Sequence, residues 1–157
     1  MSEVDRILKH YDSVLNGEAW HGDPIWQILD GISAEAAAAQ PPFEGHTIWE
    51  IVMHMSFWEG VGAKRLRGER AGLIEELNFP AMPAPTEENW KRTLEEFRAS
   101  NRSFREALAK LQPGQLDSLT AAGKRSYYGE AHGVIEHNVY HAGQLALLSK
   151  IYATKAV

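Results

Sequence analysis

Cysteine is absent from this chain of 157 residues. A transition metal would therefore have to be held by imidazole and carboxylate groups, and disulfides are excluded. Long apolar runs are also missing, since none approaches the roughly 18 residues that a membrane-spanning helix needs. The opening segment MSEVDRILKHYDSV alternates charged and apolar side chains, unlike the uninterrupted apolar stretch of a signal peptide. We therefore expect a cytoplasmic protein with no membrane partner.

Basic residues are in deficit, with 16 Lys and Arg against 21 Asp and Glu and a net charge of −5. The basic residues are also scattered, whereas binding to phosphate backbones needs clustered Lys and Arg. We therefore expect no nucleic-acid partner. A content of 44% hydrophobic and 24% charged residues is typical of a globular protein. This length fits one domain, which we expect to span residues 1–157.

Convincing period-two strand patterns are lacking, and apolar residues recur instead at three- and four-residue spacing, which is typical of amphipathic helices. Thr47 and Glu50 fit a capping box that begins a helix. Two shorter helical segments are also expected. One has Asp23 as its N-cap and Pro24 as its first helical residue, and the other lies within SAEAAAAQPP. We predict long helices over residues 3–16, 48–68, 87–111 and 128–152.

The segment 71–85 contains three prolines and little periodicity, and it is too long for a tight turn between neighbouring helices. It is typical of a crossover connection. Four long helices with one long connection predict an all-α four-helix bundle. In such bundles, cofactor sites are built from inward-facing side chains of different helices.

Two of the seven histidines, His137 and His141, stand four residues apart in EHNVYHAGQ. On a helix this spacing places both imidazoles on one face, with Cβ atoms roughly 5–6 Å apart. His54 lies on the apolar stripe of the second long helix, between Ile51 and Trp58. Burying three imidazoles costs several kcal/mol unless each finds a partner, and one cation satisfies all three. The pattern therefore predicts a metal site of His54, His137 and His141.

A polar core network without metal is the alternative, because histidine pairs at this spacing also arise by chance. The pair is not the HExxH motif of zinc proteases, since Glu136 precedes the first histidine. His10, His46 and His132 are interpreted as structural or surface residues. His21 lies in a break between helical segments, where it could line a pocket.

Two long segments, HTIWEIVMHMSFWEGVGAKRLRGE and YYGEAHGVIEHNVYHAGQLALL, resemble the DinB-like family of bacterial four-helix metal-binding proteins. AWHGDPIWQIL and ISAEAAAAQPP are similar to one branch of it. The resemblance implies an up-down-down-up bundle with the long connection between its second and third helices. It also implies a metal, zinc or nickel, held by His54, His137 and His141, and a homodimer. Many members carry arginine directly after the last histidine, where this chain has Ala142.

Three neutral imidazoles leave a metal ion at least one open coordination position, as in catalytic zinc sites. There a water could be acidified or a substrate thiol bound. The resemblance implies a metal-dependent transferase that uses a low-molecular-weight thiol, or a hydrolase, acting on a small molecule. A non-catalytic metal-binding bundle, with a stress-response or structural role, is the alternative.

Other residues near the predicted site are candidates for supporting roles. Glu50 lies one turn before His54 and could act as a base, although its capping role competes. Gln144 and Asn138 are candidate hydrogen-bond partners on the face that carries the last two histidines. Trp58 and Tyr140 are candidates to line the pocket.

Overall fold

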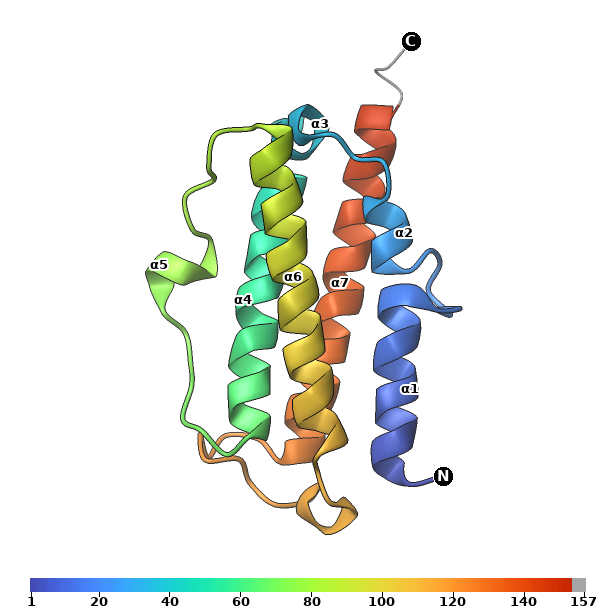
Figure 1. Cartoon of the computed structure of the whole chain (residues 1–157), viewed down its shortest axis with the longest axis vertical. Coiled ribbons are helices and arrows are strands. Elements are labelled where there is room, and N and C mark those ends of the chain that lie inside the picture. The colour runs from blue at the N-terminus through green and yellow to red at the C-terminus, as the bar shows by residue number, and fades with distance from the viewer. Residues whose placement is uncertain (154–157) are drawn as a thin grey trace.

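The long helices pack side by side in the computed structural model, which describes residues 1–153. They are α1 (Glu3–Asn16), α4 (Ile48–Leu66), α6 (Glu87–Ala109) and α7 (Tyr127–Ala153). In Figure 1, α1 and α7 run upward and α4 and α6 run downward, so the chain order is up-down-down-up. The predicted all-α bundle is confirmed. Over residues 1–153, no helix is long and apolar enough to cross a membrane.

Two of these helices begin at side-chain caps, and the sequence predicts the first of them. The hydroxyl of Thr47 accepts from the backbone N–H of Glu50 at 3.1 Å, and the Glu50 carboxylate accepts from the backbone N–H of Thr47 at 2.8 Å. At α6, the Thr86 hydroxyl accepts from the N–H of Asn89 at 3.2 Å. These bonds satisfy N–H groups that the first turn of a helix leaves without partners.

Two short helices lie between α1 and α4 in the chain. In Figure 1, α2 (Ile25–Leu29) lies above α1 and beside α7, and α3 (Ala34–Ala38) lies at the upper end of the bundle. Pro24, not Asp23, is the N-cap of α2, because its ψ of 157° is extended. The Asp23 carboxylate instead accepts a bond of 3.0 Å from the side-chain amide of Gln27. The expected segment exists, and its start is one residue later than predicted.

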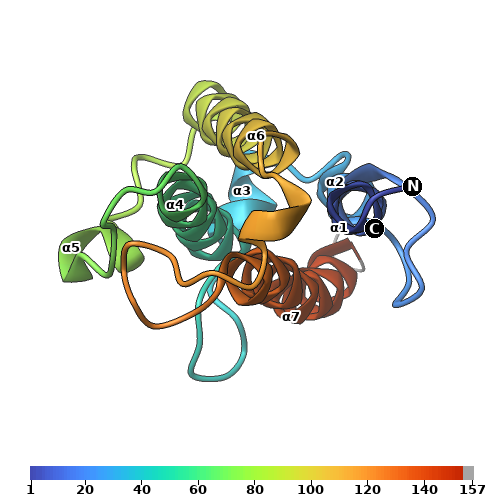
Figure 2. The same cartoon turned by 90° about the horizontal axis from the view of Figure 1, so that it is seen from below.

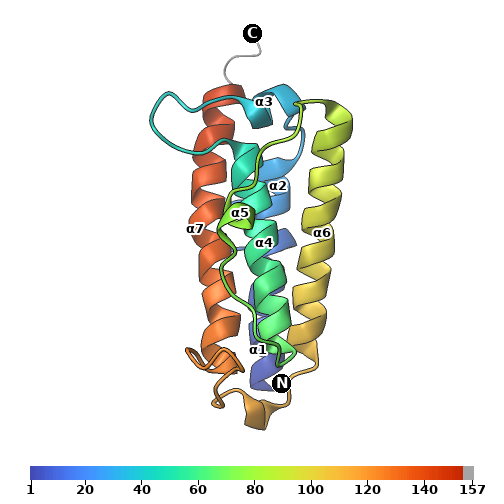
Figure 3. The ribbon, with the colours of Figure 1, turned by 90° about the vertical axis from the view of Figure 1, so that its left-hand side faces the viewer.

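The long connection between α4 and α6 returns the chain to the upper end of the bundle. Figure 3 shows it passing outside α4. It contains one short helix, α5 (Glu75–Asn78), which its weak periodicity did not indicate. This path places Asn78 and Phe79 against α4, where both contact the candidate site described below.

The buried apolar side chains form one cluster, to which all four long helices contribute. Figure 2 shows these four helices viewed along the bundle. Phe97, Phe104 and Leu108 of α6 are fully buried. Burying each such side chain stabilises the fold by about 1.5–3 kcal/mol. At Gly62 of α4, an added Cβ would lie 2.7 Å from Cγ2 of Val134 on α7. The absence of a side chain at Gly62 therefore lets these helices approach closely.

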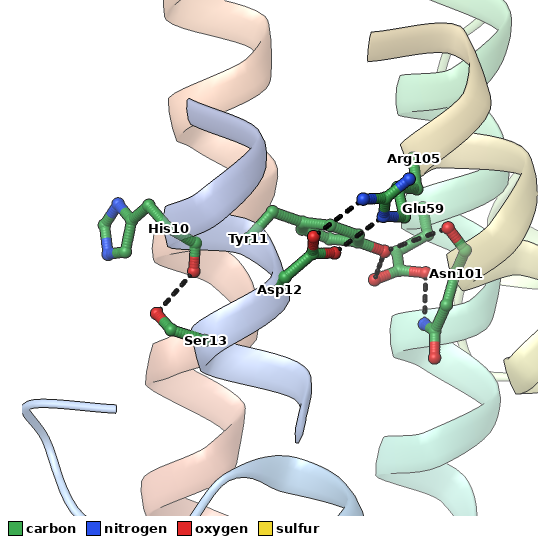
Figure 4. Close-up of polar contacts among 7 residues, drawn as sticks. All are labelled: His10, Tyr11, Asp12, Ser13, Glu59, Asn101 and Arg105. Carbon is green, nitrogen blue, oxygen red and sulfur yellow. Dashed lines mark hydrogen bonds and ion pairs between the residues drawn. The ribbon is translucent and has the colours of Figure 1, made fainter. Parts of the chain in front are cut away.

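Glu59 of α4 is a fully buried carboxylate that the sequence did not single out. It accepts hydrogen bonds from the Tyr11 hydroxyl at 2.9 Å, from the Asn138 amide at 2.7 Å and from the Asn101 amide. Figure 4 shows the Tyr11 and Asn101 contacts. The donors come from α1, α7 and α6, so this carboxylate links all four long helices.

Candidate metal centre

Three histidine side chains converge between α4 and α7. Nε2 of His137 lies 3.0 Å from Nε2 of His54 and 3.0 Å from Nε2 of His141. One ring nitrogen from each lies within 4.8 Å of the others. Two nitrogens bound to one tetrahedral zinc are roughly 3.3 Å apart. The folded chain thus gathers three potential ligand atoms at close to the spacing that a shared ion requires.

Hydrogen bonds orient two of the three rings. Nδ1 of His54 lies 2.8 Å from the carbonyl oxygen of Asn78, and Nδ1 of His141 lies 2.6 Å from Oε1 of Gln144. Because these oxygens can only accept, both Nδ1 atoms carry the hydrogen and both Nε2 atoms present a lone pair. A second-nitrogen bond of this kind is typical of metal-ligating histidines.

His137 cannot satisfy both of its neighbours by hydrogen bonding. A neutral ring with its hydrogen on Nε2 donates to one neighbouring Nε2 and leaves the lone pair of the other neighbour, 3.0 Å away, without a hydrogen to accept. With the hydrogen on Nδ1, three lone pairs face one another, and that Nδ1 is buried with no hydrogen-bond partner among the described residues. A shared cation removes this conflict, so the donor set fits a divalent metal.

Protonation does not resolve the conflict near neutral pH. Burial, reinforced by the charges of His141 and His54, lowers the pKa of His137 to about 3. Burial also lowers the pKa of His141 to about 4, and it lowers that of His54. The three rings are therefore neutral at pH 7. A metal ion would not have to displace protons from them.

A cavity of about 590 Å³ reaches all three histidines, and we call it the histidine cavity. Its apolar walls are formed by Phe43, Ile51, Phe79, Leu147 and Leu148. Among residues 1–153, no carboxylate joins the three nitrogens as a fourth ligand. The site therefore combines three imidazoles with access for a small molecule.

His46, interpreted from the sequence as a surface or structural residue, lines this cavity. Its ring stacks on Phe79 with centroids 3.7 Å apart, and Phe79 stacks on His54 at 4.2 Å. Nδ1 of His46 lies 3.8 Å from Oε2 of Glu50. Glu50 is thus held by its capping bonds and lies beside His46, and the Phe79 ring separates His46 from His54.

Two residues that the sequence predicts to line the pocket, Trp58 and Tyr140, lie near the three histidines. The Trp58 ring lies 6.4 Å from those of His54 and His137, and its indole N–H donates to Oδ1 of Asn78 at 2.9 Å. Tyr140 is 65% exposed and lies at the edge of the histidine cavity.

Two predicted pocket residues lie elsewhere. Asn138 faces the core and donates to Glu59, so it is not a partner of a site histidine. His21 is exposed and lines a separate cavity beside α1, together with Trp20. Asn78 and Phe79 were missed, because nothing in their local sequence signals contact with α4.

Together, these features define a class of protein: a helical bundle with a three-histidine group between its second and fourth long helices. The model of the DinB superfamily matches residues 20–145. The chain therefore belongs to the DinB superfamily, as the resemblance in its sequence implied. No curated protein and no solved structure compared with the chain gave a significant match.

Proposed function

We propose that this protein binds one divalent transition-metal ion, zinc or nickel, through Nε2 of His54, His137 and His141. The observation that carries the proposal is the convergence of these atoms with two contacts of 3.0 Å. Imidazole suits both metals, and the chain has no cysteine to offer a softer ligand. The Asn78 carbonyl and the Gln144 side chain hold two of the rings in the ligating tautomer.

The reaction we propose is a metal-dependent transfer or hydrolysis acting on a small molecule in the histidine cavity. A bound divalent ion would supply Lewis acidity to a water or a thiol. The apolar walls of the cavity hold the organic part of the substrate and exclude water.

A low-molecular-weight thiol is the substrate class we favour, because a thiolate is a soft ligand that suits zinc. The protein has no thiol of its own. The thiol must therefore come from a partner molecule. The homodimer and the cytoplasmic location remain predictions.

A non-catalytic metal-binding role is the second candidate. Its support is that His54 comes from α4 while His137 and His141 come from α7, so an ion would cross-link two helices. The two candidates differ at the open coordination position of the ion. A catalytic ion accepts an exogenous ligand there, and a purely structural ion does not.

Metal content is the decisive first measurement. We would purify the untagged protein and determine bound metal by elemental mass spectrometry, beside the His54→Ala, His137→Ala, His141→Ala triple variant. We expect close to one equivalent in the wild type and none in the variant. A wild type that is empty and cannot be loaded would contradict both candidates.

Cobalt substitution then separates the two candidates. A thiol that reaches the ion produces a thiolate-to-cobalt charge-transfer band, which supports the catalytic candidate. An unchanged spectrum at saturating thiol would contradict the thiol-transfer form of the catalytic candidate and favour the structural candidate over it.

A further inference from the structure

A second cavity, of about 330 Å³, lies beside the first turns of α7. We call it the basic cavity, because Arg65, Lys124 and Arg125 line it against one carboxylate, Glu130. His137 also lines it and thereby forms a wall common to the basic and histidine cavities. A locally positive cavity is notable in a protein whose net charge is −5. Its position next to a candidate metal ligand links it to the chemistry of the site.

Two of the three cations are uncompensated. Arg65 is already engaged: its Nη1 pairs with Oε1 of Glu130 at 2.9 Å, and its Nε donates to the carbonyl of Ala71 at 2.8 Å. Lys124 and Arg125 form no ion pair within residues 1–153. The cavity therefore presents free positive charge to whatever enters it.

The backbone of Arg125 is fixed at this cavity, and its guanidinium lies against α7. The backbone carbonyl of Arg125 accepts from the N–H of Thr120 at 3.0 Å and from its hydroxyl at 3.2 Å. The side chain lies over Gly133, where an added Cβ would be only 2.6 Å from Nη1. Gly133 is four residues before His137, about one helical turn. Glycine at this position lets the guanidinium lie against α7, one turn from the histidine site.

We propose that the basic cavity binds the carboxylate of an acidic small molecule. We take this molecule to be the substrate, so this inference rests on the proposed function. The planar guanidinium of Arg125 matches a carboxylate with two parallel hydrogen bonds, and Lys124 adds a second charge. Trp58 and Val134 provide apolar contact for the hydrocarbon part. These walls favour an organic acid over a bare inorganic anion.

The test compares two thiols of similar length, 3-mercaptopropionate and the neutral 3-mercapto-1-propanol, on the whole protein. Binding to the metal-free protein is followed by NMR shifts of the amides at Ala122, Lys124 and Gly133. Binding to the cobalt-loaded protein is followed by thiolate-to-cobalt charge transfer. Inorganic phosphate is a third probe, which separates organic acids from anions in general.

We expect the wild type to bind the charged thiol about tenfold more tightly than the neutral one, as one charge-assisted bidentate pair would give. Arg125→Gln should remove this preference and leave neutral-thiol binding unchanged. Gly133→Ala should reduce it by displacing the guanidinium, while the helix is retained or strengthened because alanine is the better helix former. Arg92→Gln, an exposed change on α6 away from both cavities, should leave the preference intact.

Equal binding of the two thiols by the wild type, or a preference that survives both variants, would overturn the inference. So would phosphate binding as tightly as the organic acid. If both thiols produced charge transfer and bound with equal affinity, the proposed function would stand, and carboxylate binding in the basic cavity would be overturned. A preference in the metal-free protein without any charge transfer would support the cavity and count against thiol binding at the metal.

Discussion

Asn138 donates a hydrogen bond of 2.7 Å to the buried carboxylate of Glu59, and it directly follows the candidate ligand His137 in the chain. Adjacent residues of a helix point about 100° apart, so one side chain faces the core while the other faces the candidate metal centre. The bond to Glu59 therefore fixes the rotation of α7 about its axis. That rotation aims His137 and His141 toward His54.

The ionisation of Glu59 should make stability depend on pH. Burial raises the pKa of Glu59 from 4.5 to about 6, and the bonds from Asn101, Asn138 and Tyr11 oppose the rise. The folded state thus keeps this proton between pH 4.5 and 6, where the unfolded chain releases it. The contribution of Glu59 to stability is fully present below pH 4.5 and is lost as the pH rises through about 6. The difference amounts to about 2 kcal/mol.

Glu59→Gln isolates this effect. We expect the free energy of unfolding of the metal-free wild type, minus that of Glu59→Gln, to fall by about 1.5 kcal/mol from pH 4.5 to pH 6.5. Urea titrations at half-unit pH intervals measure it, and taking the difference cancels the histidine titrations that both proteins share. A difference that is constant with pH would show that the pKa of Glu59 is not raised.

Metal affinity should depend on Gln144. Gln144→Leu removes the oxygen that lies 2.6 Å from Nδ1 of His141, so this ring loses its fixed tautomer. Loss of such a partner typically weakens metal binding about 10–100-fold. Competition against a zinc-chelating dye measures the change. Gln27→Leu, the same substitution at an exposed position on α2, is the control and should bind zinc as the wild type does.

Zinc should stabilise the fold against heat. At a free zinc concentration 100 times the dissociation constant, binding adds about 2.7 kcal/mol. For a chain of this size the unfolding midpoint should rise by about 5–10 °C. Scanning calorimetry with and without zinc checks this, and the triple histidine variant should show no rise. An equal rise in that variant would place the bound zinc elsewhere.

Two glycines of α4 should respond in opposite directions to the same substitution. Gly62→Ala puts a Cβ 2.7 Å from Val134 and 3.0 Å from Phe104, so we expect a loss of about 1–3 kcal/mol through overpacking. At Gly60 an added Cβ meets nothing within 4 Å, so Gly60→Ala should stabilise the helix by up to about 1 kcal/mol. Chemical denaturation of both variants measures the contrast. A Gly62→Ala protein as stable as the wild type would show that α4 and α7 can separate without cost.

The sequence by itself determined the local contacts of this protein. The capping box of Thr47 and Glu50 and the pairing of His137 with His141 span three or four residues, so helix geometry alone relates their side chains. His54 was identifiable because it interrupts an apolar stripe that must face the core. The four long helices followed from their periodicity in the same way.

Contacts between distant segments were decided only by the tertiary structure. Glu59 bonds to Tyr11 and Asn138, 48 and 79 residues away, and nothing in its neighbourhood along the chain indicates these partners. Asn78 reaches His54 because the crossover connection passes along α4. Such contacts depend on the path of the connections and on the rotation of each helix, which follow from packing of the whole chain and not from local helix propensity.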